Sequence, residues 1–448
     1  MKKLITLLLC GIFLVGCTTN KSFNSSTEDN QSTQDLENIK TASKYDFIDI
    51  EKAKTDLELF KEECLDGHYA LINEPEVKTE FMNKYNEVMT KLEGKNEIKI
   101  NTLYFMIREI ANVLNDEHFF IKSSKATNYL PVKLKWLQEG LVVAESDCKQ
   151  LEPGDKITMI GNKTIDEIFV NMDNVISAQS SYWVKFRAAD FLVRAYTLEW
   201  LECLNDTNSV DLMVEKYDGS LDNVNVKLTS LYLYAKNSLK NSKKLSQVKT
   251  KTFANKNIAI FELNKCIMST LYLEKLEEFF DYVEINHIDN ILLDLRNNNG
   301  GTSIVTEEFL SYVNVPKECA NSIFYLTEQK QRKLYNGNIY VATSNKTFSS
   351  AVLVTGEMKY NKLATIIGEP TGAPYTHYGY PIPKDKTLKN TRFKYSFSTC
   401  KFFKDDEYDV EYKDSIYPDI NIPLISFHII NDIDPIEEWI NNNKNFDK

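Results

Sequence analysis

One serine stands where hydrolases often carry a nucleophile. Ser349 lies in the segment KTFSSA at 346–351, between a hydrophobic run at 339–342 and a helix-like pattern at 350–360. Many hydrolases expose a reactive serine at such a turn from strand to helix. A serine here would also suit the N-cap of the following helix, whose first N–H groups need acceptors. The segment alone leaves both interpretations open.

A glycine turn follows a second hydrophobic run. The segment DLRNNNGG at 294–301 ends in Gly300 and Gly301. Glycine lets neighbouring backbone N–H groups point to one spot, which is how an oxyanion is held. A strand that ends in asparagine and glycine also makes an ordinary turn, so this pattern is a second candidate and no more.

The last third of the chain alternates short hydrophobic runs with helix-like patterns. Strands are expected at 258–261, 291–295, 339–342 and 364–367, and helices at 271–283, 306–313 and 350–360. Buried strands that alternate with helices predict a layered α/β core with a parallel sheet. Both candidate segments would then lie at the ends of its strands.

The preceding residues have a different texture. Between 44 and 126 hydrophobic residues recur at helical spacing, which predicts a helical domain. From 127 to 232 the runs are short and β-like, and the segment PGDKITMIGN at 153–162 resembles a strand and turn of PDZ domains. A lysine-rich connector is expected near 235–251, and the catalytic core is expected at 252–448.

The first residues of the chain have the pattern of a leader. Lys2 and Lys3 precede a hydrophobic run at 4–16 that ends at Cys17, which resembles a bacterial lipoprotein signal. The run is too short to span a bilayer comfortably. The resemblance implies a signal peptide at 1–17, lipidation of Cys17, and a location in the cell envelope outside the cytoplasm. A plain secretory signal with a chance cysteine is the alternative. The polar residues 18–43 predict a disordered tether.

Composition excludes several classes of function. With 53 basic and 64 acidic side chains, the net charge is −11 and no basic stripe is present, which argues against nucleic-acid binding. The histidines are few and no cysteines form a C-x-x-C pair, so neither a metal site, a cofactor nor a disulfide framework is expected.

Three motifs in order carry a family resemblance. DLRNNNGG at 294–301, TFSSA at 347–351 and GEPTG at 368–372 are similar to the core of the tail-specific, or C-terminal processing, serine peptidases. This resemblance implies a crotonase/ClpP-like layered α/β core and a serine endopeptidase that acts on proteins or peptides. The PDZ-like segment would receive the C-terminus of the substrate as an added strand.

The resemblance also distinguishes two catalytic designs. One branch places a lysine base 25 residues after the serine, where this chain has Pro374. The other, typified by the tricorn protease core and related to interphotoreceptor retinoid-binding protein, takes a histidine from an Asp-Gly-His-Thr motif. Asp116 and His118 match this motif, with Glu117 in place of its glycine. His118 is therefore the expected base, with His377 or a lysine from elsewhere as alternatives.

The resemblance implies a third catalytic residue near the C-terminal end. Glu411 precedes Tyr417-Pro418-Asp419-Ile420, which is similar to the closing segment of the family, and Asp414 is the alternative carboxylate.

In the resulting hypothesis, His118 takes the proton of Ser349 and Glu411 orients the imidazole. The N–H groups of Gly300, Gly301 and Ser350 are the candidates for the oxyanion hole. The alternative function is that of a non-catalytic lipoprotein that binds a ligand or peptide on the same core.

Overall fold

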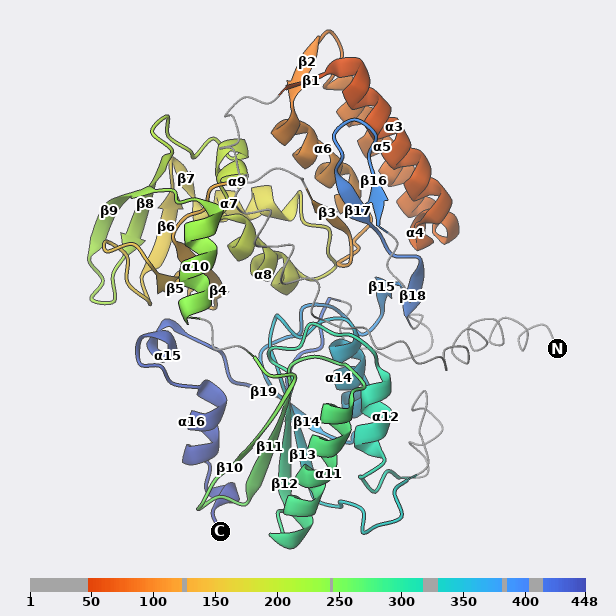
Figure 1. Cartoon of the computed structure of the whole chain (residues 1–448), viewed down its shortest axis with the longest axis vertical. Coiled ribbons are helices and arrows are strands. Elements are labelled where there is room, and N and C mark those ends of the chain that lie inside the picture. Colours follow the sequence, from red (N-terminus) through yellow and green to blue (C-terminus); the bar gives the residue numbers. More distant parts are fainter. Residues whose placement is uncertain (1–46, 123–126, 242–244, 317–328, 381–384, 403–413) are drawn as a thin grey trace, which may run out of the picture. The chain divides into compact units, whose positions relative to one another are not determined.

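A parallel sheet forms the centre of the C-terminal part of the chain (Figure 1). The structure, a computed structural model, describes residues 47–122, 127–241, 245–316, 329–380, 385–402 and 414–448. The order of the strands is β10-β11-β12-β13-β14-β19. Their bounds are β10 (Val248–Thr252), β11 (Ile258–Leu263), β12 (Asn290–Asp294), β13 (Asn338–Thr343), β14 (Thr365–Gly368) and β19 (Ile420–Asn421). All neighbouring pairs are parallel except β10 with β11.

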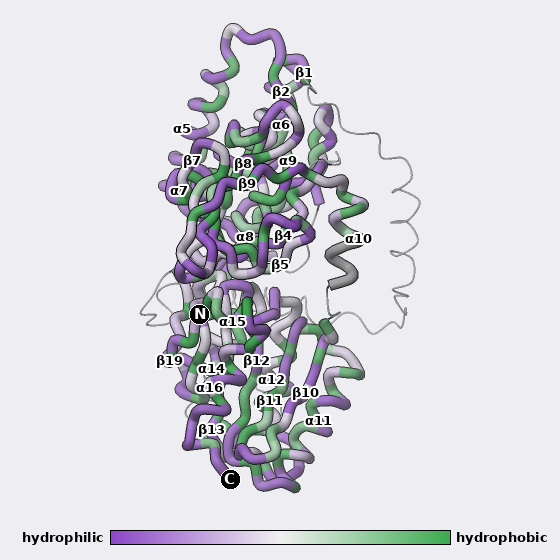
Figure 2. Tube along the Cα trace, turned by 90° about the vertical axis from the view of Figure 1, so that its left-hand side faces the viewer, coloured by the Kyte–Doolittle hydropathy of each residue, from purple (hydrophilic) through white to green (hydrophobic). Residues whose placement is uncertain are grey.

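Helices cover both faces of this sheet. A hydrophobic cluster joins one face to α11 (Thr270–Ile285), α12 (Ile304–Leu310) and α14 (Ser350–Tyr360). A smaller cluster joins the other face to α16 (Pro435–Asn442) and the 3-10 helix η2 (Lys444–Phe446). Strands β11 and β12 between them are among the hydrophobic stretches of the chain (Figure 2). The expected layered α/β core, with its alternating strands and helices, is confirmed.

The expected connector has regular structure. It contains most of helix α10 (Leu231–Asn241) and all but the last residue of strand β10 at the sheet edge. Only Val248 of β10 is buried, since the strand alternates lysine with threonine. Charged residues are typical of edge strands. Because of its lysines, β10 has no hydrophobic run by which it could be predicted.

The N-terminal region is helical, as predicted. It consists of α3 (Ile50–Gly67), α4 (Tyr69–Asn73), α5 (Pro75–Thr90) and α6 (Ile100–Asn112), with a small ribbon of β1 (Phe47–Asp49) and β2 (Glu97–Lys99). A segment far away in sequence packs beside this region. Strand β3 (Phe120–Lys122) pairs with β17 (Lys394–Ser396), which in turn pairs with β16 (Lys386–Thr387). These strands connect the N-terminal region to the segment that follows the GEPTG motif.

A six-stranded antiparallel sheet lies in the middle of the sequence. Its main order is β4-β5-β6-β8-β9, with β7 paired to β6. The strands are β4 (Val132–Leu137), β5 (Gly140–Ser146), β6 (Lys156–Ile160), β7 (Lys163–Thr164), β8 (Ser209–Glu215) and β9 (Leu221–Lys227). The accompanying helices are α7 (Ile165–Asp173), α8 (Ser181–Phe191) and α9 (Ala195–Trp200). The PDZ-like character of this region stays a prediction.

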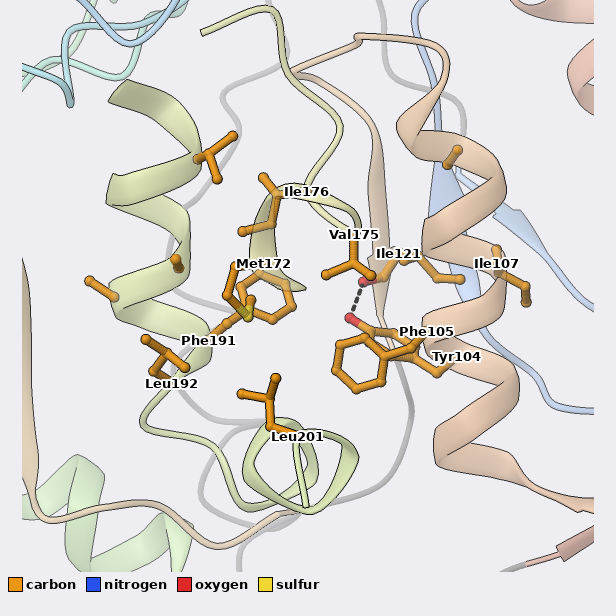
Figure 3. Packing of buried hydrophobic residues seen from close by; sticks show 14 of the residues in the cluster. Tyr104, Phe105, Ile107, Ile121, Met172, Val175, Ile176, Phe191, Leu192 and Leu201 are labelled. Carbon is orange, nitrogen blue, oxygen red and sulfur yellow. Dashed lines mark hydrogen bonds between the residues drawn. The ribbon is translucent and has the colours of Figure 1, made fainter. Parts of the chain in front are cut away.

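One hydrophobic cluster joins the N-terminal helices to the middle region. Figure 3 shows Phe105 of α6 near Phe191 of α8 and Leu201 after α9, and Tyr104 donates a hydrogen bond to the carbonyl oxygen of Ile121 at 3.2 Å. The same cluster includes Phe348, beside the candidate nucleophile. The middle region is therefore part of the support of the candidate site.

A short strand pair and a short helix complete the described fold. Strands β15 (His377–Gly379) and β18 (Cys400–Phe402) form an antiparallel pair, and helix α15 (Ser426–Ile430) precedes α16. Within the described ranges, no helix is long and hydrophobic enough to cross a membrane. The expected signal peptide at 1–17, with Cys17, and the whole of the expected tether at 18–43 lie outside the described residues.

Candidate active site

Ser349 has a strained backbone at the start of α14. Its φ of 54° and ψ of −127° are rare for a residue with a side chain. It occupies the N-cap position, yet its side chain makes no capping hydrogen bond. The interpretation of this serine as a side-chain cap is therefore wrong, and the strain marks it as a candidate functional residue.

The hydroxyl of Ser349 instead lies beside an imidazole from far upstream. Its Oγ is 3.0 Å from Nε2 of His118, which follows α6 and precedes β3. A serine hydroxyl can donate to Nε2 only when that nitrogen carries no proton. This contact brings together two of the residues that the sequence predicted for catalysis.

Aromatic rings stack along His118. The centroid of the Phe348 ring lies 4.5 Å from that of the imidazole. Trp183 of α8 stacks on Phe348, with 4.1 Å between the ring centroids and 16° between the ring planes. The imidazole of His377 stacks on that of His118, with 5.8 Å between the ring centroids and 12° between the ring planes. Tyr380 meets the same ring edge-on at 5.4 Å. This stack restricts the orientation of the imidazole.

His118 is set up to be neutral at neutral pH. Burial lowers its pKa from the usual 6.5, while the negative charge of Asp116 and the backbone of Tyr378 act in the opposite direction. Its Nδ1 is buried and makes no hydrogen bond of good geometry among the residues that the structure describes. A neutral imidazole with a free Nε2 lone pair is the form that can accept the proton of Ser349.

Asp116 is a buried carboxylate behind His118. It is fully buried and accepts hydrogen bonds from the backbone N–H of His118 at 2.9 Å and from Ser398. His68, at the start of α4, lies 3.3 Å from its Oδ2. Although burial opposes ionisation, the contacts of His68 and Ser398 hold the pKa of Asp116 below its usual value. Sequence analysis missed His68 and Ser398.

The nucleophile segment and the glycine turn are joined by several hydrogen bonds. Phe348 donates its N–H to the carbonyl oxygen of Asn298 at 3.0 Å, and Ser350 donates its hydroxyl to the carbonyl oxygen of Gly301 at 2.8 Å. Gly300 and Gly301 have φ values of 101° and 140°. A Cβ on Gly300 would lie 2.7 Å from that of Ser349, so only glycine fits.

The three oxyanion candidates differ in their hydrogen bonding. The N–H of Gly300 donates to Oδ1 of Asn298 at 2.9 Å, so this donor is engaged. Asn298 in turn donates from its Nδ2 to the carbonyl oxygen of Leu263 at 2.8 Å. Gly300 therefore shapes the turn, while the N–H groups of Gly301 and Ser350 stay the candidates that flank Ser349.

The other predicted residues have varied positions. Nδ1 of His377 lies 2.9 Å from the carbonyl oxygen of Pro374, and burial and the neighbouring His118 lower its pKa to about 4. The hydroxyl of Tyr417 donates to Asp414 at 3.1 Å. Glu411 lies outside the described residues.

Comparison with protein families matches residues 257–422 to "Peptidase family S41". The chain contains a peptidase family S41 domain. Comparison with curated protein sequences gives no match. The S41 domain contains Ser349 and the glycine turn, and it makes the chain a serine-type peptidase. His118 comes from outside the matched residues.

Several solved structures are similar to this S41 peptidase, and the two CPAF structures share its fold. The crystal structure of mature CPAF is 13% identical, with a TM-score of 0.64, and the match covers 87% of this chain and 96% of that one. The structure of mature CPAF complexed with lactacystin is 13% identical at the same TM-score, with 87% and 97% covered. The tricorn protease is 15% identical at a TM-score of 0.40, with 87% and 36% covered.

Proposed function

We propose that this serine-type peptidase cleaves peptide bonds by attack of Ser349, with His118 as the general base. The observation that carries the proposal is the 3.0 Å contact between Ser349 Oγ and His118 Nε2. The strained backbone and uncapped side chain of Ser349 support it. No helix-capping role would require either feature.

The reaction follows from this geometry. As Ser349 Oγ bonds to the carbonyl carbon of the substrate, its proton passes to Nε2 of His118. The carbonyl oxygen becomes an oxyanion, which the N–H groups of Gly301 and Ser350 stabilise. His118 then gives its proton to the leaving amine, and water releases the acyl group by the same steps in reverse. The tilted ring of Phe348, with its centroid 4.5 Å from that of the imidazole, is an aromatic neighbour that favours the transient positive charge.

Glu411 is proposed to accept a hydrogen bond from Nδ1 of His118. The basis is the resemblance to the closing segment of the family. Glu411→Gln should lower kcat by on the order of 10²–10⁴, as for other triad carboxylates. Asp414→Asn is the matched control, since Asp414 is engaged by Tyr417. If Glu411→Gln has the wild-type kcat and Asp414→Asn is inactive, the third catalytic residue is Asp414 instead of Glu411.

The middle region is proposed to bind an extended substrate segment. Strand β4 is an edge strand of its sheet, and an edge offers free backbone groups to a peptide. Deletion of the region would not test this, because its residues share a hydrophobic cluster with Phe348. Peptides with single N-methylated bonds are a better test. A position where methylation raises KM is expected, and uniform KM values would refute strand addition.

The peptidase is proposed to be lipid-anchored at Cys17, outside the cytoplasm of a bacterium. The support is the sequence pattern at 1–17, in which two lysines and a hydrophobic run precede Cys17 as in a bacterial lipoprotein signal. Metabolic labelling with a fatty-acid analogue should mark the wild-type chain and fail to mark Cys17→Ala. Equal labelling of both would refute the anchor at this cysteine.

A fluorophosphonate probe tests the proposal as a whole. The probe bonds to an activated serine, so the wild-type chain should gain the mass of one adduct. A non-catalytic binding protein on the same core would gain none. Labelling that persists at the wild-type rate in His118→Ala would show that another group, such as a lysine, is the base.

A further inference from the structure

We infer that Asp116 is a positioning residue for the catalytic base, with His68 as the residue that holds Asp116 in place. This inference rests on the proposed roles of Ser349 and His118. It adds a fixed carboxylate behind the base to those roles.

The hydrogen bonds around Asp116 use both of its carboxylate oxygens. Oδ1 accepts from the N–H of His118 at 2.9 Å and from the hydroxyl of Ser398 at 2.7 Å. Oδ2 accepts from the N–H of Ser398 at 2.9 Å and lies 3.3 Å from Nε2 of His68. Donors from three segments that lie far from one another in sequence, at residues 68, 118 and 398, therefore converge on one buried carboxylate. Such an arrangement stabilises the charged form and leaves it little freedom to move.

The protonation of His68 follows from its second contact. Its Nδ1 accepts the backbone N–H of Ala70 at 3.1 Å, as the side-chain cap of α4. Because this nitrogen accepts, the proton of neutral His68 is on Nε2, which then donates to Asp116. His68 thus performs two separable tasks: it caps α4 and it fixes the carboxylate.

The fixed carboxylate affects His118 in two ways. Its bond to the His118 N–H holds the backbone from which the imidazole extends. Its negative charge raises the pKa of His118 against the effect of burial and stabilises the imidazolium that forms when Ser349 loses its proton. The other titratable groups close to Asp116 or His118 are Cys64, His68, Glu117, His377, Tyr378 and Tyr380.

Two substitutions separate the tasks of His68. In His68→Asn, Oδ1 takes the place of Nδ1, so the cap is kept and the donor to Asp116 is lost. In His68→Gln, Nε2 takes the place of the ring Nε2, so the donor is kept and the cap is lost. The full-length variants are compared by the rate of fluorophosphonate labelling against pH, with thermal unfolding as the measure of folding.

If Asp116 positions the base, His68→Asn lowers the labelling rate by about 10-fold, by analogy with the lower end of the loss when a partner behind a metal-bound imidazole is removed. The pH range over which its labelling rate rises, the acid limb of the profile, also moves to lower pH. The reason is that the charge that raises the pKa of His118 is held less firmly. His68→Gln keeps the wild-type limb. The reverse pattern, with Asn normal and Gln impaired, would reduce His68 to a helix cap and overturn the inference.

Asp116→Asn provides the second measurement. It removes the charge, so labelling should slow by about 100-fold and the acid limb should move below that of the wild type. A slower rate with an unmoved limb would mean a purely structural role and would overturn the inference. A wild-type chain that does not react with the probe would overturn the proposed function and the inference together, whereas a reactive wild type with three wild-type-like variants would overturn the inference alone.

Discussion

Ser349 and His118 are held in place by different means. Ser349 lies between β13 and α14 of the S41 domain, and its position follows from the backbone of a rigid sheet and from a glycine turn next to it. His118 lies in a short segment between α6 and β3, outside the matched domain. Its position depends on a buried carboxylate and on stacked rings contributed by distant parts of the chain.

We call the surroundings of Ser349 the nucleophile half of the site and the surroundings of His118 the base half. The difference indicates which substitutions should damage each half. Local backbone geometry presents the nucleophile, so substitutions that change this backbone should damage it. Side-chain contacts of long sequence separation hold the base, so substitutions far from Ser349 should damage it.

Removal of the nucleophile has the largest expected effect. Ser349→Ala should reduce turnover of a protein substrate by on the order of 10⁶, as loss of a nucleophile does in other serine peptidases. The fold should be unchanged, because the side chain makes no capping bond. Hydrolysis assays and thermal unfolding provide the two measurements, and substantial remaining turnover would disprove the role of Ser349.

Gly300→Ala should be the next most damaging change. The new Cβ would lie 2.7 Å from Ser349 Cβ at a φ of 101°, so the turn beside the nucleophile must move. A loss of about 10²–10³ in kcat is expected, similar to the loss of an oxyanion donor. Gly94→Ala is the control, because Gly94 has a φ of 71° but no atom within 4 Å of the new Cβ. Equal kcat values for both variants would contradict the tight fit.

This nucleophile half is also the part of the molecule that could be predicted from sequence. The alternation of hydrophobic runs and helical spacing identified β11 to β14 and their helices, and the motif identified Ser349. Those signals are local, since period and turn chemistry are read over a few residues. The edge strand β10 was missed because its outward lysines interrupt the hydrophobic pattern.

The base half was only partly predictable. His118 was found through its motif, but nothing near His68 or Ser398 in the sequence indicates that they meet at Asp116. His68 is 48 residues from Asp116, and Ser398 is 282 residues away. Such contacts are set by tertiary packing and leave no local pattern. Glu411 stays a prediction.

Trp183→Phe should have a moderate effect on the base half. Trp183 stacks on Phe348, which lies against His118. A shorter ring loosens this stack at a cost of about 1 kcal/mol, and a roughly 5- to 10-fold loss in kcat/KM is expected. Trp200→Phe is the matched control, because Trp200 stacks on Phe105 at 4.1 Å and 14° but not on the site. A similar loss in both variants would mean a general effect on stability.

Glu117→Gln should change stability more than activity. Burial raises the pKa of Glu117 from 4.5 to about 8. Because the folded chain holds this proton more tightly than the unfolded chain, wild-type stability falls as pH rises from about 4.5 to 8. Each pKa unit corresponds to about 1.4 kcal/mol, so the glutamine variant should unfold at a higher temperature than the wild type at pH 8. At pH 5 the two should be similar, and the same difference at both pH values would disprove the buried ionisation.

The most direct test of the account is the rate of fluorophosphonate labelling against pH, with the modified residue identified by mass spectrometry. The adduct is expected on Ser349, and its rate should rise with pH through a midpoint below 6.5, because burial lowers the pKa of His118. In His118→Ala this titration should disappear and the rate should fall by on the order of 10³ or more. An adduct on another residue, or an unchanged titration in His118→Ala, would contradict the pairing of Ser349 with His118.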